Sequence, residues 1–320
     1  MPRSYYGQFP EGVQIAGINI NVHTKGQIYY VCNSSVAAKY GVGSSDANSG
    51  LSPDYPLATI KQAITNCVAS RGDKIILMPG HAESVSAAAG IDFNKAGIEI
   101  IGVGEGAQRP KITLGTANTA TVRISAADIS ITNVLFVANF LNIAACVVIT
   151  TGKDAKFNKV EFRDTSAILN FVKAIQTDST DNHADGLSVR QCDYNGLGTS
   201  ATTSLINAQG AIDRLYVSQN KVDVQGTTAT SGALILATSK AMTHLYCEDN
   251  DVMSNLTTTA AGAMIVAGTG CSGIVKNNSC ICVAGPTDLL CTASTGLGFV
   301  NNYFQGAADA SGYLLPAADV

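Results

Sequence analysis

Residues 215–224 read LYVSQNKVDV, and the same short pattern returns as LYCEDNDVMS at 245–254, GIVKNNSCIC at 273–282 and GLGFVNNYF at 296–304. In each copy apolar residues alternate with other residues up to one polar position, and the next apolar residue of the pattern follows three positions later. Alternation with a period of two predicts a β-strand. The longer step predicts that the chain turns a corner at the polar position, so each copy is a strand, a corner and a second strand.

The pattern extends through most of the chain when it is aligned on its polar position, which we call the anchor. The anchors are Asn133, Lys159, Gln191, Gln219, Asp249, Asn277 and Asn301, at a mean spacing of 28 residues. A second apolar run lies between most copies: ACVVIT, SLINAQ, ALILAT, AMIVAG, DLLCTA and, last, YLLPAA. No unit is long or amphipathic enough for a helix in every repeat. The sequence therefore predicts an all-β fold, a single-stranded parallel β-helix.

An asparagine directly follows the anchor in the last four copies, at Asn220, Asn250, Asn278 and Asn302. Neighbouring coils lie about 4.8 Å apart, so these side chains can hydrogen bond to one another and to the backbone of the corner, whose dihedral angles asparagine tolerates well. We expect a structural ladder, because an interior ladder satisfies buried backbone groups instead of meeting a substrate. A glycosidase-type role for these amides is the alternative.

The two ends of such a stack need covers, because terminal strands leave backbone groups unpaired. In residues 52–70 an apolar stripe recurs at helical spacing and predicts an amphipathic capping α-helix: Leu57, Ile60, Ala63, Ile64, Cys67 and Val68. Ile75 and Leu77 then begin the first of about nine coils. We divide the chain into an extended N-terminal arm at 1–26, an N-terminal cap at 27–72 and the parallel β-helix at 73–320.

The arm carries aromatic and apolar residues ahead of the coils. An arm of this kind would fray unless something held it, and we expect a partner subunit to do so through Tyr5, Tyr6, Phe9 and Ile15. The alternative is that the arm packs along its own solenoid.

The composition excludes several classes of partner. Charged residues make up 14% of the chain, the net charge is −4, and like charges form no run. These values indicate neither a nucleic-acid-binding stripe nor a patch for an anionic membrane, and they favour surfaces that meet another subunit.

Nine scattered cysteines predict reduced core thiols rather than disulfides or a metal site. The N-terminus lacks the pattern of a signal peptide, so we expect the chain to be made and folded in a cytoplasm, without a cofactor.

Two acidic clusters are candidates for a glycan-cleaving site, which needs paired carboxylates. The better candidate is TDSTDNHADG at 177–186, where Asp178, Asp181, His183 and Asp185 lie in one loop between strands, although a solvated turn or an ion-binding loop explains it too. The second cluster, Glu248, Asp249 and Asp251, falls on a corner and has a structural explanation. The chain has no Trp for stacking on sugar rings, and basic residues are sparse after Arg214, which argues against a groove for anionic glycans.

The stretches VGSSDANSGLSPDYPLATIKQAI at 42–64, GDKIILMPGHAESV at 72–85 and GIEIIGVG at 97–104 resemble the opening of pectate-lyase-like right-handed β-helix proteins encoded by tailed bacteriophages. The resemblance implies that fold over about residues 27–305, but the fold serves enzymes and inert virion parts alike. We expect a non-enzymatic virion protein: a decoration or cement protein that forms homotrimers on the phage head and contacts the major capsid protein. The alternative is a tailspike-like protein that binds or degrades a glycan.

Overall fold

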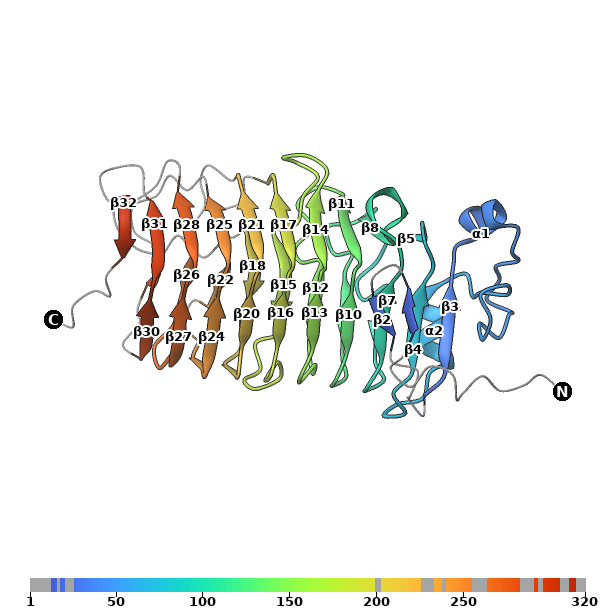
Figure 1. Cartoon of the computed structure of the whole chain (residues 1–320), viewed down its shortest axis with the longest axis horizontal. Coiled ribbons are helices and arrows are strands. Elements are labelled where there is room, and N and C mark those ends of the chain that lie inside the picture. Colours follow the sequence, from blue (N-terminus) through green and yellow to red (C-terminus); the bar gives the residue numbers. More distant parts are fainter. Residues whose placement is uncertain are drawn as a thin grey trace.

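The computed structural model describes residues 13–15, 18–20, 26–198, 203–225, 233–237, 240–254, 264–282, 291–292, 296–305 and 311–314. Most described strands belong to three long sheets that surround one apolar core (Figure 1). Sheet I consists, in spatial order, of β3 (Ile28–Val31), β4 (Lys74–Leu77), β7 (Glu99–Gly102), β10 (Ser130–Thr132), β13 (Lys156–Asn158), β16 (Ser188–Arg190), β20 (Tyr216–Ser218), β24 (Leu245–Glu248), β27 (Gly273–Lys276) and β30 (Leu297–Val300).

Sheets II and III complete the wall of the solenoid. Sheet II contains β5 (Ala82–Val85), β8 (Lys111–Gly115), β11 (Leu135–Asn139), β14 (Glu161–Asp164), β17 (Asp193–Gly196), β21 (Lys221–Val224), β25 (Asp251–Ser254), β28 (Ser279–Cys282), β31 (Asn302–Gln305) and β32 (Ser311–Leu314). Sheet III contains β6 (Ile91–Phe93), β9 (Val122–Ile124), β12 (Val147–Ile149), β15 (Lys173–Thr177), β18 (Ser204–Asn207), β22 (Ile235–Leu236), β26 (Ile265–Val266) and β29 (Cys291–Thr292).

Successive turns of the chain visit sheets I, II and III in order, and neighbouring strands from successive turns pair in parallel, as Val189 does with Val217 and Val217 with Cys247. The predicted all-β parallel solenoid is therefore confirmed. Its right-handedness, its count of nine coils and the division into arm, cap and β-helix stay predictions. Two short pairs lie outside the long sheets: β19 (Ile212–Asp213) with β23 (Met242–Thr243), and β1 (Val13–Ile15) with β2 (Ile18–Ile20).

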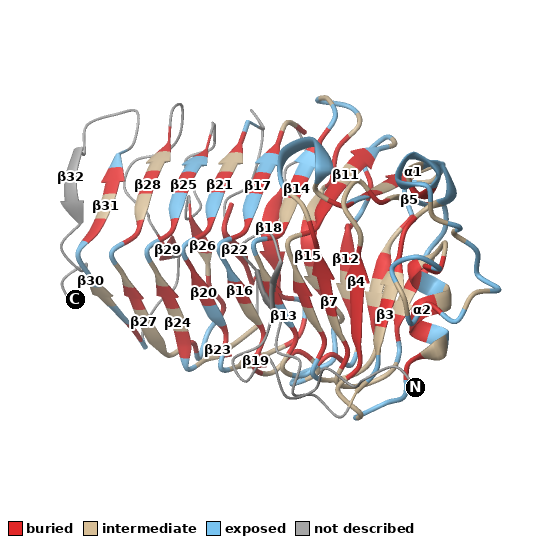
Figure 2. Ribbon diagram, turned by 45° about the vertical axis from the view of Figure 1, so that its right-hand side comes forward, coloured by how far each residue is buried: buried red, intermediate tan, exposed pale blue. Residues whose placement is uncertain are grey.

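The core is built from the inward positions of the alternation. Figure 2 shows buried residues recurring along the strands of the stack. Aromatic side chains of neighbouring turns contact one another, with Phe136 and Phe162 stacked at 5.5 Å between ring centroids and Tyr194 edge-on to Phe162 at 6.5 Å. All nine cysteines are buried, which agrees with their expected role as core side chains.

Every anchor lies at the corner between sheet I and sheet II, as predicted. All seven adopt a left-handed backbone conformation, with φ between 50° and 57°. That conformation reverses the chain direction locally but costs L-residues about 1–2 kcal/mol, so it occurs in single residues. The ladder asparagines, to which the sequence argument assigned the unusual dihedral angles, have negative φ. The strained residue is thus the anchor before them.

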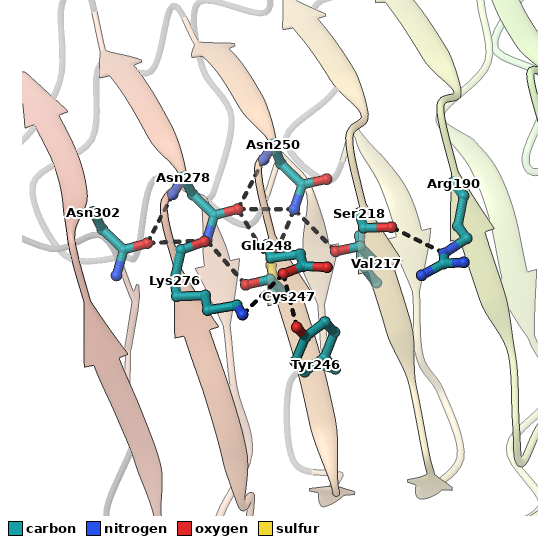
Figure 3. Close-up of polar contacts among 10 residues, drawn as sticks. All are labelled: Arg190, Val217, Ser218, Tyr246, Cys247, Glu248, Asn250, Lys276, Asn278 and Asn302. Atoms are coloured by element: carbon teal, nitrogen blue, oxygen red, sulfur yellow. Dashed lines mark hydrogen bonds and ion pairs between the residues drawn. The ribbon is translucent and has the colours of Figure 1, made fainter.

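The four ladder asparagines are fully buried. They hydrogen bond from coil to coil, as Figure 3 shows for Asn250, Asn278 and Asn302. The side-chain amide of Asn250 donates to Oδ1 of Asn278 at 2.8 Å, and that of Asn278 donates to Oδ1 of Asn302 at 2.9 Å. Each Oδ1 also accepts a backbone N–H from the preceding coil, as Asn250 does from Asn220 at 3.0 Å. The ladder therefore satisfies buried backbone donors at the corner.

The N-terminal end contains more regular structure than the sequence argument assigned to it. The predicted helix is α2 (Ile60–Asn66), which Thr59 caps by accepting a hydrogen bond from the N–H of Gln62, and which contacts β3, β4 and β6. Val68, placed on its apolar stripe, is half exposed, because the helix ends before it. The first strand of sheet I is β3 rather than the strand at Ile75 and Leu77, and a second helix, α1 (Ser34–Tyr40), follows it.

The C-terminal run YLLPAA begins at Tyr313, and only its first two residues are described. The repeat pattern predicted that this run would add a strand to sheet III. Tyr313 and Leu314 instead belong to β32, which pairs antiparallel with β31 in sheet II and places Tyr313 opposite Tyr303. A run of apolar residues specifies a strand but not its partner. Of the expected partner contacts, Tyr5, Tyr6 and Phe9 lie outside the described residues, and Ile15 lies in β1. Neither described α-helix is long and apolar enough to cross a membrane.

Candidate functional site

The acidic loop at 177–186 connects β15 to β16, and its side chains mostly bind neighbouring segments. Asp178 Oδ2 lies 2.9 Å from Nδ1 of His183, so these two predicted residues do meet. Asp181 instead accepts hydrogen bonds from the N–H of Ala211 and from Lys240, both at 2.9 Å, which lower the pKa of its carboxyl.

Asp185 is committed to a third partner. Its Oδ1 accepts the N–H of Asp213 at 2.9 Å, and its other oxygen lies 3.7 Å from Lys153. The three carboxylates therefore act on different segments and form no convergent pair. Across the described ranges, no group of three or more His, Cys, Asp or Glu side chains is placed to hold a metal ion.

A better candidate lies on the outer face of sheet I, where the repeat register arranges side chains in two rows. The first row, three positions before the anchors, contains Ser130, Lys156, Ser188, Tyr216, Tyr246, Ile274 and Gly298, with Glu99 at its N-terminal end. The second row, one position before the anchors, contains Thr132, Asn158, Arg190, Ser218, Glu248, Lys276 and Val300. Each coil contributes one residue to each row.

These rows line a groove of about 580 Å³ that extends across the strands from β7 to β24. Its lining is mostly hydroxyl, amide and charged side chains: Glu99, Ser130, Thr132, Lys156, Asn158, Ser188, Arg190, Gln191, Ser218, Gln219 and Glu248, with Phe157 among them. Five inter-strand steps separate β7 from β24, which is about 24 Å. The groove thus has the length of an oligomer rather than of a single small molecule.

The charges in the groove are arranged with compensated ends and a cationic centre. Glu99 pairs with Lys74, and Glu248 lies 3.1 Å from Lys276. Tyr246 donates its hydroxyl to Glu248 at 2.8 Å, and this bond, together with Lys276, lowers the pKa of the Glu248 carboxyl (Figure 3).

Lys156 and Arg190 lie on the adjacent strands β13 and β16, between the two glutamates. Both are exposed, and no ion pair joins either to a carboxylate in the part of the chain that the structure describes. The guanidinium Nε of Arg190 donates to the Ser218 hydroxyl at 3.1 Å, which holds the arginine along the groove (Figure 3). The centre therefore carries two positive charges that can attract an anionic group.

Two tyrosines continue the first row beyond Ser188. The rings of Tyr216 and Tyr246 are 6.4 Å apart between centroids and tilted by 54°, and the ammonium of Lys276 lies 4.9 Å above the Tyr246 ring. Amphipathic rings of this kind present an apolar surface beside hydrogen-bonding groups. The absence of Trp therefore does not remove aromatic surface from this face of the solenoid.

Sequence reasoning missed this groove, and the count of basic residues after Arg214 was the wrong test for it. Lys156 and Arg190 precede that point, and they are 34 residues apart in a sequence where neighbouring coils are about 28 apart. Because each row takes one residue from each coil, no short motif can show it. Aligning the positions one and three before each anchor would have placed these two cations on adjacent strands.

No protein-family model and no curated protein matches this sequence. Solved structures that it resembles include a rhamnogalacturonan lyase, at 11% identity and a TM-score of 0.45, with 91% of this chain and 90% of that one covered. Another is a GH136 lacto-N-biosidase from Eubacterium ramulus, at 10% identity and a TM-score of 0.40, with 89% of this chain and 66% of that one covered. Both similar structures are carbohydrate-active enzymes by name.

Proposed function

We propose that this protein binds an extended acidic glycan in the groove on the outer face of sheet I. The observation that carries the proposal is the cationic centre formed by Lys156 and Arg190 within a groove otherwise lined by hydroxyls and amides. Such groups hydrogen bond to sugar hydroxyls, and the guanidinium is a suitable fork for a carboxylate or sulfate. Tyr216 and Tyr246 extend the same face and can stack on sugar rings.

The spacing of carboxylates favours binding over hydrolysis. Glycosidases hold their two carboxyl groups about 5–9.5 Å apart. Glu99 and Glu248, the two carboxylates that line the groove, lie on strands about 24 Å apart. The described groove therefore holds no pair with glycosidase geometry, and we propose a non-hydrolytic glycan-binding role.

The proposal is tested by calorimetric titration with an acidic oligosaccharide and with a neutral one of the same length. We expect tighter binding of the acidic ligand, weakened by salt because exposed charges are screened. Arg190→Gln and Lys156→Gln should each reduce affinity by about tenfold or more, since a hydrogen bond to a charged group contributes about 1.5–3 kcal/mol. Lys240→Gln is the matched control, because Lys240 pairs with Asp181 and does not line the groove. Equal affinity for both ligands, or unchanged affinity in both groove variants, would refute an acidic-glycan site.

The ultraviolet absorbance of the same protein–ligand mixtures distinguishes binding from cleavage. A lyase uses a basic side chain to abstract a proton and cations to neutralise a uronate, and Lys156 and Arg190 are the groups that could do so. Elimination leaves a carbon–carbon double bond in the product, which absorbs in the ultraviolet. We expect no increase in ultraviolet absorbance when these mixtures are incubated, and an increase abolished by Lys156→Gln would identify an enzyme instead.

A structural role in a bacteriophage particle is our second candidate, and it is compatible with glycan binding at a tail. Its support is the charge-poor composition, which suits contact with another subunit. We propose a homotrimer that joins a virion, through the major capsid protein if it sits on the head. Light scattering of the purified chain should give three times the mass of the monomer, and a monomer at micromolar concentration would contradict the trimer.

A further inference from the structure

The charged side chains of the groove are unevenly distributed along its length. Lys156 and Arg190 lie on adjacent strands, so the cationic centre occupies one inter-strand step of about 5 Å. Glu99 and Glu248 lie on strands two steps away from the nearer of these cations, about 10 Å on either side. A ligand that fills the groove therefore extends past the centre in both directions and reaches a carboxylate at each end.

The carboxylate at the β24 end of the groove is bound on one oxygen. The Tyr246 hydroxyl donates to Oε2 of Glu248 at 2.8 Å, and the ammonium of Lys276 lies 3.1 Å from the same atom. Figure 3 shows the other carboxylate oxygen of Glu248 pointing away from these two side chains. Glu248 belongs to the groove lining and Lys276 does not. A ligand at this end therefore meets an ionised oxygen before it meets the compensating cation.

The carboxylate at the β7 end has the same arrangement. Lys74 binds Oε2 of Glu99, and the lysine side chain is only 8% exposed whereas that of Glu99 is 36% exposed. The ammonium thus lies behind the carboxylate as seen from solvent, and Glu99 is the one of the two that lines the groove. Both ends therefore present carboxylate oxygens to a ligand, although each carboxylate is paired within the protein.

These two ends distinguish neutral sugars from acidic ones. An ionised carboxylate accepts hydrogen bonds and donates none, so it binds a sugar hydroxyl through a charge-assisted bond. The carboxylate or sulfate of an acidic sugar is itself an anionic acceptor and is repelled at the same distance. Lys156 and Arg190 do not offset this repulsion, because about 10 Å separates their strands from those of the glutamates and salt screens exposed charges over about 8 Å.

We propose that the groove selects a sparsely charged glycan, in which an isolated acidic sugar lies at the Lys156–Arg190 centre and neutral sugars lie at both ends. Glu99 and Glu248 are then specificity-determining residues that accept sugar hydroxyls and reject acid groups. The inference rests on the proposed glycan-binding function and narrows its ligand class to heteroglycans whose acidic sugars are separated by neutral ones. A homopolymer of uronic acid is excluded from tight binding, because it places a carboxylate at each end.

Three forms of one oligogalacturonate, long enough to fill the groove, test the proposal by calorimetric titration. One form has a free carboxylate on every sugar, one is methyl-esterified on all but a central sugar, and one is fully esterified. We expect the singly charged form to bind about tenfold more tightly than the fully charged form, because repulsion acts at both ends. Tighter binding of the fully charged form would overturn this inference and leave the acidic-glycan site standing. Binding of the neutral form as tight as that of the singly charged form would refute the site itself, and the inference with it.

Glu248→Gln tests which group discriminates between the ligands. The amide oxygen can still accept the Tyr246 hydroxyl, but the negative charge is lost, so the ratio of the fully charged to the singly charged dissociation constant should fall about fivefold. Glu105→Gln is the matched control, because it removes the same charge from an exposed turn outside the groove lining. Glu99→Gln is the second choice, since it leaves the buried Lys74 unpaired. An unchanged ratio in Glu248→Gln, or an equal fall in Glu105→Gln, would contradict the role of the groove ends.

Discussion

At the scale of the residue, two adjacent positions build each corner between sheets I and II. The anchor supplies the left-handed turn, and in the last coils the asparagine after it supplies hydrogen bonds to the neighbouring coil. The earlier coils carry Val134, Val160 and Cys192 at the second position, all buried. At the N-terminal end of the ladder, the N–H of Cys192 donates to Oδ1 of Asn220 at 2.9 Å.

Removing one member of the ladder should destabilise the whole corner. In Asn250→Leu the backbone N–H of Asn220 and the carbonyl of Val217 each lose the hydrogen bond that the Asn250 side chain makes with them. We expect the free energy of unfolding to fall by about 1–3 kcal/mol, the cost of leaving a buried polar group unsatisfied. Urea denaturation measures it. Asn195→Leu, an exposed change in β17, is the control and should alter the free energy of unfolding by less than about 0.5 kcal/mol. A loss in Asn250→Leu no larger than that of the control would show that the ladder does not stabilise the fold.

At the scale of the element, one buried carboxylate joins two loops of successive turns. Asp164, at the end of β14, accepts N–H groups from Phe171 at 2.8 Å in its own turn and from Leu197 at 2.8 Å and Gly198 at 3.2 Å in the next. Burial nevertheless dominates over these bonds and raises the pKa of Asp164 to about 7. The folded protein therefore retains this proton at pH values where the unfolded chain has released it.

This shift predicts a loss of stability as pH rises. The unfolded carboxyl ionises near pH 3.9, so between about pH 4 and pH 7 the unfolded state binds fewer protons than the folded state. The free energy of unfolding therefore falls as the pH rises through this range. Three pKa units correspond to about 4 kcal/mol at most. Urea unfolding at successive pH values should show this decline in the wild type, and Asp164→Asn should flatten it.

Asp92→Asn is the control for that pH series. Burial raises the pKa of the Asp92 carboxyl, but hydrogen bonds from Arg123 and Ser125 outweigh burial and lower it overall. The stability that these bonds contribute is therefore fully present once the pH exceeds the unfolded pKa of about 4. The substitution should reduce stability by a constant amount and leave the slope between pH 4.5 and 7 as in the wild type. A slope that Asp164→Asn does not change would show that this carboxyl ionises normally in the fold.

The elements also show which parts of the structure the sequence could predict. The corner positions and the strands of sheets I and II follow from a repeat that is strict near each anchor, because inward side chains must be apolar and the turn must fall at one place. Strand β3 and helix α1 were missed because they occur once, without a repeat to reveal them. Strand β32 was misassigned because its partner, β31, is chosen by geometry at the end of the stack.

The candidate site was predictable only in part for a related reason. The acidic loop drew attention because Asp178, Asp181 and Asp185 are close in sequence, yet each carboxylate binds a different segment. The groove residues Lys156 and Arg190 are neighbours only through the pairing of β13 with β16. Proximity across coils is a property of the register, and it becomes visible only when the repeat is aligned by its anchors.

At the scale of the whole molecule, the buried cysteines report how the solenoid unfolds. They are distributed along the stack, and burial raises the pKa of Cys67, Cys192 and Cys291 to about 12, so the folded thiols are unreactive. Each coil contacts mainly its neighbours, and a terminal coil has a neighbour on one side only. We therefore expect pulsed alkylation in rising urea to modify Cys291 before Cys146 and Cys192. Simultaneous modification of all nine thiols would instead show a single cooperative transition.

The two rows on sheet I have a consequence for how this protein could change. Each coil contributes one residue to each row of the groove. A ligand that lies along the groove therefore contacts residues that are about 28 positions apart in the sequence. Substituting the residue one position before an anchor changes one side chain of the groove and leaves the buried side chains of that coil unchanged. Duplicating a whole coil would lengthen the groove by one residue in each row. Specificity and stability are therefore encoded at separate positions of the same repeat and can diverge independently.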